Sequence, residues 1–122
     1  MSEADRKEMI IEEKIFDLLV RLGISPRYKG FRLLSWYIKD QLAQTTNESN
    51  MEVYQRLADL TDDAWENTAR AMRFAMQRAQ EIGGEENIRM LIGQVPPSRG
   101  KSDPVAFARL CISAVRRDLC DL

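Results

Sequence analysis

The sequence predicts an all-α fold, a compact domain of six helices. Apolar residues recur at three- and four-residue spacing in long runs, as the buried face of an amphipathic helix requires. Glycine, proline and short polar clusters separate these runs. A chain of 122 residues is long enough for one hydrophobic core but not for two. We therefore expect 1–122 to form a single helical domain.

The first two predicted helices, 4–22 and 29–44, are separated by a break at Gly23 and Pro26. Glycine commonly follows the last turn of a helix, and proline cannot continue one. The apolar face of the first helix consists of Met9, Ile10, Ile15, Leu18, Leu19 and Leu22. That of the second consists of Phe31, Leu34, Trp36, Tyr37, Ile38 and Leu42.

The third and fourth predicted helices, 51–60 and 64–82, are joined by a tight polar turn. We expect Asn50 to cap the third helix, and Asp63 and Glu66 to form a capping box at the start of the fourth. A short helix, a tight turn and a long helix with small inner residues are typical of a helix-turn-helix. We place this motif at about 51–82.

Fewer sequence signals mark the last two predicted helices. Gly83 ends the fourth helix, a fifth follows over 85–92, and a loop leads to a sixth that begins at Asp103-Pro104 and ends near 119. Three methionines, Met72, Met76 and Met90, are expected to fill gaps in the core.

Composition weighs against an enzyme. The chain has no histidine, so histidine-based catalytic arrangements are excluded and a metal site lacks its usual ligands. Cys111 and Cys120 lie nine positions apart, about 13 Å along one helix, too far for a disulfide. We expect both to be structural thiols, with no catalytic residue, metal or cofactor. A charged N-terminus and the lack of a spanning apolar stretch predict a cytoplasmic protein without membrane contact.

One face of the long fourth helix carries the side chains that read DNA bases. Positions 66, 70, 73 and 77 share this face and position 67 lies beside it. Arginine, asparagine and glutamine contact guanine and adenine edges, and glutamate accepts from cytosine. An ordinary solvated helix face, with Glu66 paired to Arg70, is the alternative. The candidate base contacts are Glu66, Asn67, Arg70, Arg73 and Gln77.

Basic residues outside this helix are candidate phosphate contacts, although scattered surface charge explains them equally well. Lys29 and Arg32 lie at the start of the second helix, and Arg99 and Lys101 lie in the loop before the last. The net charge of −1 and pI of about 5.5 are unusual for a DNA-binding domain. They motivate an alternative function, a protein-interaction module that kept the fold but lost DNA binding.

Two stretches resemble a known family. The run LGISPRYKGFRLL at 22–34 is similar to the LGIPxxxKGYxYL opening of the C-terminal DNA-binding domain of the stage-zero sporulation response regulator A family. Val53-Tyr54, Leu57-Ala58 and the run RAMRFAM at 70–76 resemble that family's VYPxIA…RAIRHAI. The interval between the two stretches is the same, and the resemblance covers about 11–119.

The resemblance implies a six-helix effector domain that binds double-stranded DNA at short operator boxes, often as a homodimer on tandem sites, and touches an RNA polymerase sigma factor. Arg70 and Arg73 match family arginines, and the Lys29-Gly30 pair becomes a candidate backbone-positioning element. We therefore predict a sequence-specific DNA-binding transcriptional regulator.

Several positions depart from the family pattern. Asn67 and Ala69 replace an arginine and a glutamate, Phe74 replaces a histidine, and Asp62 and Asp63 add negative charge. Operator sequence or affinity should differ accordingly. The receiver domain that precedes this module in the family is expected to be absent, so control by phosphorylation cannot be carried over.

Overall fold

The computed structural model describes residues 2–94 and 103–120, and within them it is all-helical, as predicted. Each predicted boundary lies within one residue of the observed one. No helix in this part of the chain is both long and apolar enough to cross a membrane. The helices are α1 (Glu3–Arg21), α2 (Lys29–Ala43), α3 (Asn50–Thr61), α4 (Trp65–Ile82), α5 (Gly84–Ile92) and α6 (Pro104–Cys120).

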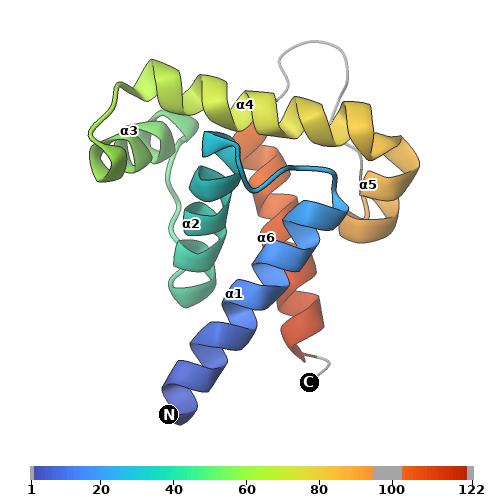
Figure 1. Ribbon diagram of the computed structural model, residues 1–122. Coiled ribbons are helices and arrows are strands. Elements are labelled where there is room, and N and C mark those ends of the chain that lie inside the picture. Colours follow the sequence, from blue (N-terminus) through green and yellow to red (C-terminus); the bar gives the residue numbers. More distant parts are fainter. Residues whose placement is uncertain (1, 95–102, 121–122) are drawn as a thin grey trace.

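Helix α4 lies across one end of the molecule like a crossbar, over α2 and α6 (Figure 1). It packs against α2, α3, α5 and α6, while α1 packs against α2 and α6. Helix α3 lies beneath the first half of α4, and α5 turns back beneath its other end (Figure 1). The first half of α1 extends away from the body, and its residues 3–10 are exposed. This arrangement leaves one long side of α4 facing outward.

The core lies between α4 and the helices beneath it. Met72 and Met76 of α4 are fully buried there, as predicted. Met90, predicted to belong to the core, is instead 76% exposed on α5. Cys111 is buried, whereas Cys120 is exposed near the end of α6, so the expected burial holds for only one thiol. Helical spacing identified the right faces but could not show how far each face is covered.

Two predicted helix caps are wrong. Ser49 rather than Asn50 caps α3, forming a capping box with Glu52, and the Asn50 amide donates to Asp103 at 2.9 Å. Asp63 does not form a capping box with Glu66, because Ala64 occupies the N-cap position of α4. In both cases the polar side chain is engaged by another element, a contact that local sequence does not reveal.

The end of α1 is joined to the α4–α5 junction by a close backbone contact. A Cβ added at Gly83 would lie 2.5 Å from the Leu22 carbonyl oxygen. The Asn87 side chain donates to the Arg21 carbonyl oxygen at 2.8 Å, satisfying a group that the end of α1 leaves without a helical partner. The contact fixes the far end of α4 on the rest of the domain.

Candidate nucleic-acid interface

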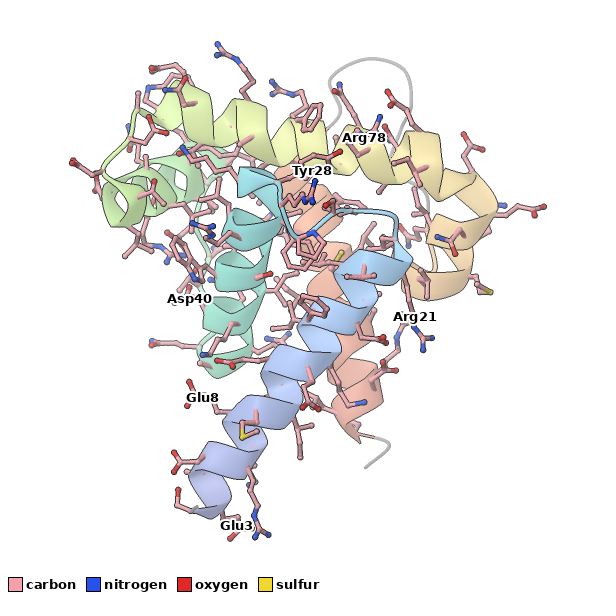
Figure 2. All side chains as sticks on the ribbon, viewed as in Figure 1. Glu3, Glu8, Arg21, Tyr28, Asp40 and Arg78 are labelled. Carbon is pink, nitrogen blue, oxygen red and sulfur yellow. The ribbon has the colours of Figure 1, made fainter. Side chains whose placement is uncertain are left out.

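The outward side of α4 carries all five residues predicted to contact bases. Each of them is exposed, as their shared spacing requires, and no described helix covers this side of α4. Figure 2 shows the side chains projecting from it into open space. The opposite side is buried and holds Thr68, Ala69, Met72, Ala75, Met76 and Ala79.

Positive charge is concentrated in the middle of this face. Arg70 and Arg73 are exposed and form no ion pair within the described part of the chain. The alternative Glu66–Arg70 pair is therefore not formed, and Glu66 places a carboxylate at the start of the helix. Further along, Arg78 pairs with Glu81 at 3.0 Å. Arg70 and Arg73, without ion-pair partners among the described residues, are about one helical turn apart, a spacing that suits adjacent contacts along a groove.

The charge of Arg73 also acts on Tyr54 of α3. Burial raises the pKa of Tyr54, the carboxylate of Asp103 raises it further, and the positive charge of Arg73 lowers it. Tyr54 is largely buried beneath α4. The charge of the exposed Arg73 therefore acts across the α3–α4 contact.

An exposed aromatic residue, Phe74, lies between the two arginines and Gln77 in sequence. The residue is 45% exposed, and its ring meets the ring of Tyr28 edge to face, with centroids 5.1 Å apart. Tyr28 is the residue before α2 and lies directly beneath α4 (Figure 2). Phe74 thus belongs to the candidate interface, although its spacing alone suggested no role in contact.

The turn from α3 to α4 is held by Asp63. Its carboxylate pairs with Lys29, accepts from the Ala64 backbone N–H at 2.8 Å and accepts from the Asn67 amide at 2.8 Å. The hydrogen bond from Lys29 is the main cause that lowers the pKa of Asp63 to about 2, with smaller contributions from Asn67 and Ala64. Asn67 and Lys29 are therefore held by one carboxylate.

Gly30 has a packing role that differs from the predicted one. It is buried, and a Cβ at this position would lie 2.2 Å from the Ala71 carbonyl oxygen and 2.7 Å from the Ala75 Cβ. The glycine lets the backbone of α2 approach α4 within the distance that a side chain would occupy. A buried residue cannot reach a phosphate, so Gly30 leaves the set of candidate contacts.

Arg32 is exposed and shares a hollow with Arg27 and Lys29 beside the end of α3. It stays a candidate phosphate contact. Arg99 and Lys101 lie outside the described residues.

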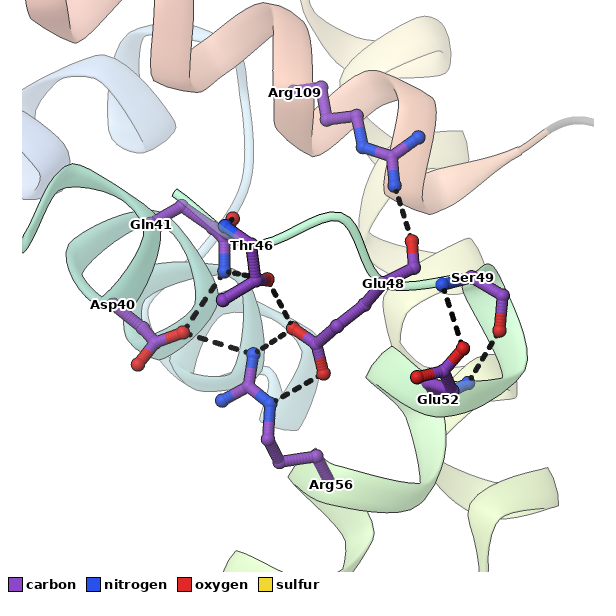
Figure 3. Close-up of polar contacts among 8 residues, drawn as sticks. All are labelled: Asp40, Gln41, Thr46, Glu48, Ser49, Glu52, Arg56 and Arg109. Atoms are coloured by element: carbon purple, nitrogen blue, oxygen red, sulfur yellow. Dashed lines mark hydrogen bonds and ion pairs between the residues drawn. The ribbon is translucent and has the colours of Figure 1, made fainter. Parts of the chain in front are cut away.

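A polar clamp orders the connector between α2 and α3 (Figure 3). The Glu48 carboxylate accepts from the Arg56 Nε and Nη2 atoms at 2.8 Å each, and from the Thr46 hydroxyl at 2.6 Å. These bonds, chiefly that from Arg56, lower the pKa of Glu48. Arg56 also reaches Asp40 at 3.0 Å.

Arginines of α6 extend the clamp to the last helix. Arg109 donates to the Glu48 carbonyl oxygen at 3.0 Å, and Arg116 donates to the Gln41 carbonyl oxygen at the same distance. The clamp thus joins α3 and its connector to α2 and α6. Glu48 and Arg56 are 8 positions apart, whereas Arg109 and Arg116 lie 61 and 75 positions from their acceptors. No local motif therefore marked the whole clamp.

No protein-family model, no curated protein and no solved structure matches the chain.

Proposed function

We propose that the protein is a sequence-specific DNA-binding transcriptional regulator. In this proposal α3 and α4 act as a helix-turn-helix and the outward side of α4 enters the major groove. The observation that carries it is the pair of exposed arginines, Arg70 and Arg73, without ion-pair partners in the described chain on an uncovered helix face. The resemblance of 22–34 and 70–76 to the sporulation regulator domain supports the same function.

In this proposal different residues of α4 contact different bases. Arg70 and Arg73 supply bidentate donors suited to guanine, and Gln77 suits adenine. Asn67 already donates one amide hydrogen to Asp63, so its carbonyl oxygen and second amide hydrogen are the groups left for a base. Arg32 contacts a phosphate beside the groove, while Lys29 orients the turn through its ion pair.

Carboxylates at the start of α4 shift the expected contacts along the helix. Asp62 and Glu66 are exposed there, where recognition helices usually approach the bases. Phosphate repulsion is expected to move the principal contacts to 70–77. We expect moderate affinity that falls steeply with salt, since phosphate contacts dominate DNA binding.

The test is a selection of bound sequences from random double-stranded DNA, followed by titration of the selected site. Arg70→Ala and Arg73→Ala should each weaken binding by about 1–3 kcal/mol and relax specificity at one base pair. Arg89→Ala is the matched control, because Arg89 is exposed on α5, away from this face. Equal binding by both α4 variants and the wild type would refute the assignment of the helix.

The protein-interaction module is the second candidate, and the acidic start of α4 favours it. Asp62 and Glu66 would repel a phosphate backbone but suit a basic protein partner. The two functions differ in salt dependence, since the slope of log affinity against log salt is near −0.9 for each phosphate neutralised. Lack of any DNA retention at low salt would favour the module. A sigma factor and a second copy on tandem sites are partners proposed from the family resemblance alone.

A further inference from the structure

A groove between α2 and α3 lies away from the outward side of α4. Its volume is about 490 Å³, and its α2 wall is contributed by 36–43 and its α3 wall by 56–60. The lining residues are Trp36, Lys39, Asp40, Ala43, Arg56, Leu57 and Leu60. We call it the α2–α3 groove.

Large apolar side chains stand on both walls of the α2–α3 groove. Trp36 on α2 is 39% exposed and Leu60 on α3 is 63% exposed, and buried Leu57 contributes to the lining between them. Exposed apolar side chains that share a concave surface mark binding sites more often than isolated ones do. Tryptophan in particular dominates the binding energy of protein interfaces.

The charges around the groove differ between its two ends. Lys39 is already held by Glu8 at 2.7 Å and by Glu12 at 2.5 Å. Arg56 is likewise held by the clamp through Glu48. Arg56 also pairs with Asp40 at 3.0 Å. Each of these cations therefore has two carboxylate partners, and this end of the groove carries an excess of negative charge among the described residues.

Unpaired positive charge lies at the other end. A second hollow adjoins the groove and shares Trp36 with it, and its lining includes Arg27 and Arg32. Both arginines are exposed, and neither has an ion-pair partner within the described residues. The groove with Trp36 and Leu60 on its walls thus continues into a hollow lined by two guanidinium groups, the groups best suited to bind carboxylates.

We infer that the α2–α3 groove binds a short acidic and apolar segment of a partner protein. One or two large apolar side chains of the segment pack against Trp36 and Leu60, and its carboxylates pair with Arg27 and Arg32. A nucleic-acid backbone would pair with the arginines but would leave the apolar walls uncovered. The inference goes beyond the proposed DNA binding and does not require it, because Trp36, Leu60 and Arg27 do not belong to the DNA-contacting set. Arg32 is the one residue that the two proposals share.

The experiment starts from the full chain with Trp65→Phe, in which Trp36 is the only tryptophan. A phage library of random dodecapeptides is selected against this protein, and enriched peptides are synthesised and titrated while Trp36 fluorescence is followed. Enriched peptides should combine a leucine or aromatic residue with net negative charge. Binding should shift the Trp36 emission to shorter wavelength, because the indole becomes shielded from water.

Variants at exposed positions separate binding from folding. Leu60→Glu and Arg32→Glu, each in the Trp65→Phe background, should weaken peptide binding by at least about tenfold while helical circular dichroism stays unchanged. Met90→Glu is the matched control, since Met90 is the more exposed apolar residue and lies on α5; it should bind as the parent does. Trp36 itself is left intact because it is the fluorescent probe.

Three results would overturn the inference: no enriched peptide, enriched peptides without acidic bias, or equal binding by the Leu60→Glu variant. A second titration, of a short DNA duplex into the same protein, tests whether the groove binds nucleic acid instead. If the duplex shifts Trp36 emission and Leu60→Glu abolishes the shift, the groove binds nucleic acid and the inference is again wrong. If no duplex binds anywhere while the peptides do, the proposed DNA binding fails and the groove assignment stands.

Discussion

Lys29 forms an ion pair with Asp63, which lies 34 positions later in the chain. The pair joins the first residue of α2 to the turn that starts α4. The same carboxylate also accepts from the Ala64 backbone and the Asn67 side chain. One acidic side chain therefore sets both the approach of α2 and the direction in which α4 leaves the turn.

The Asp63 contacts predict a stability difference that depends on pH. The pKa of Asp63 is lowered from 3.8 to about 2, so its contribution is fully present above the unfolded pKa and is lost as the pH falls from about 4 to about 2. Asp63→Asn should therefore lower the urea midpoint near neutral pH, and the difference from wild type should shrink over this acid range. Asp59→Asn, at an exposed position on α3, is the control. A pH-independent difference would contradict this account of the turn.

Gly30→Ala should destabilise the protein because α2 and α4 cross at this residue. The added Cβ would lie 2.2 Å from the Ala71 carbonyl oxygen, and overpacking of this kind costs about 1–3 kcal/mol. Chemical denaturation measures the change, with exposed Arg32→Ala in the same helix as the control. At an open helix position the same substitution would stabilise by about 0.5–1 kcal/mol, and that outcome would exclude the close crossing.

Removal of the Glu48 charge should loosen the connector between α2 and α3. Glu48→Gln loses part of the two-bond contact with Arg56, and hydrogen bonds to charged groups contribute about 1.5–3 kcal/mol. Because the pKa of Glu48 is lowered, its contribution is present above the ordinary value of 4.5 and is lost at lower pH. Unfolding of Glu48→Gln, Arg56→Met and the double variant gives the coupling energy. Additive effects would show that the clamp is not cooperative; exposed Glu13→Gln serves as the control.

The two cysteines should react at very different rates with a thiol reagent. Cys120 is exposed, whereas Cys111 is buried, and burial raises the pKa of the Cys111 thiol to about 12. The native protein should release one equivalent of chromophore from Ellman's reagent rapidly and the second only on unfolding, because the thiolate is the reactive form. Cys120→Ser should abolish the rapid phase. Rapid loss of both thiols would contradict the packing of α6.

Local pattern was enough to predict the helices and the exposed face of α4. The spacing of Arg70 and Arg73 fixed which side they share, and burial of Met72 and Met76 on the opposite side confirms that periodicity. Met90 shows the limit of this reasoning. Helical phase says which side an apolar residue occupies, but α5 is short and nothing in the described chain covers Met90 there.

The caps and the glycine at the helix crossing required the assembled fold. Asp63 looked like the first residue of a capping box, but Lys29 and Asn67 bind its carboxylate. Gly30 looked like part of a phosphate contact, but it lies beneath α4. For Asp63 the deciding distant partner is Lys29 and for Gly30 it is Ala71, each far away in sequence and brought close only by packing.

By itself, the sequence determined where the chain is helical and which side of each helix is apolar, because both depend on residues within a few positions of one another. The tertiary structure decided which polar groups stay available to a partner. Arg70 and Arg73 remain without ion-pair partners in the described chain, while Lys29, Lys39 and Arg56 are held by carboxylates. The distinction arises because a charge is available or neutralised according to its neighbours in space, and those neighbours are set by helix packing.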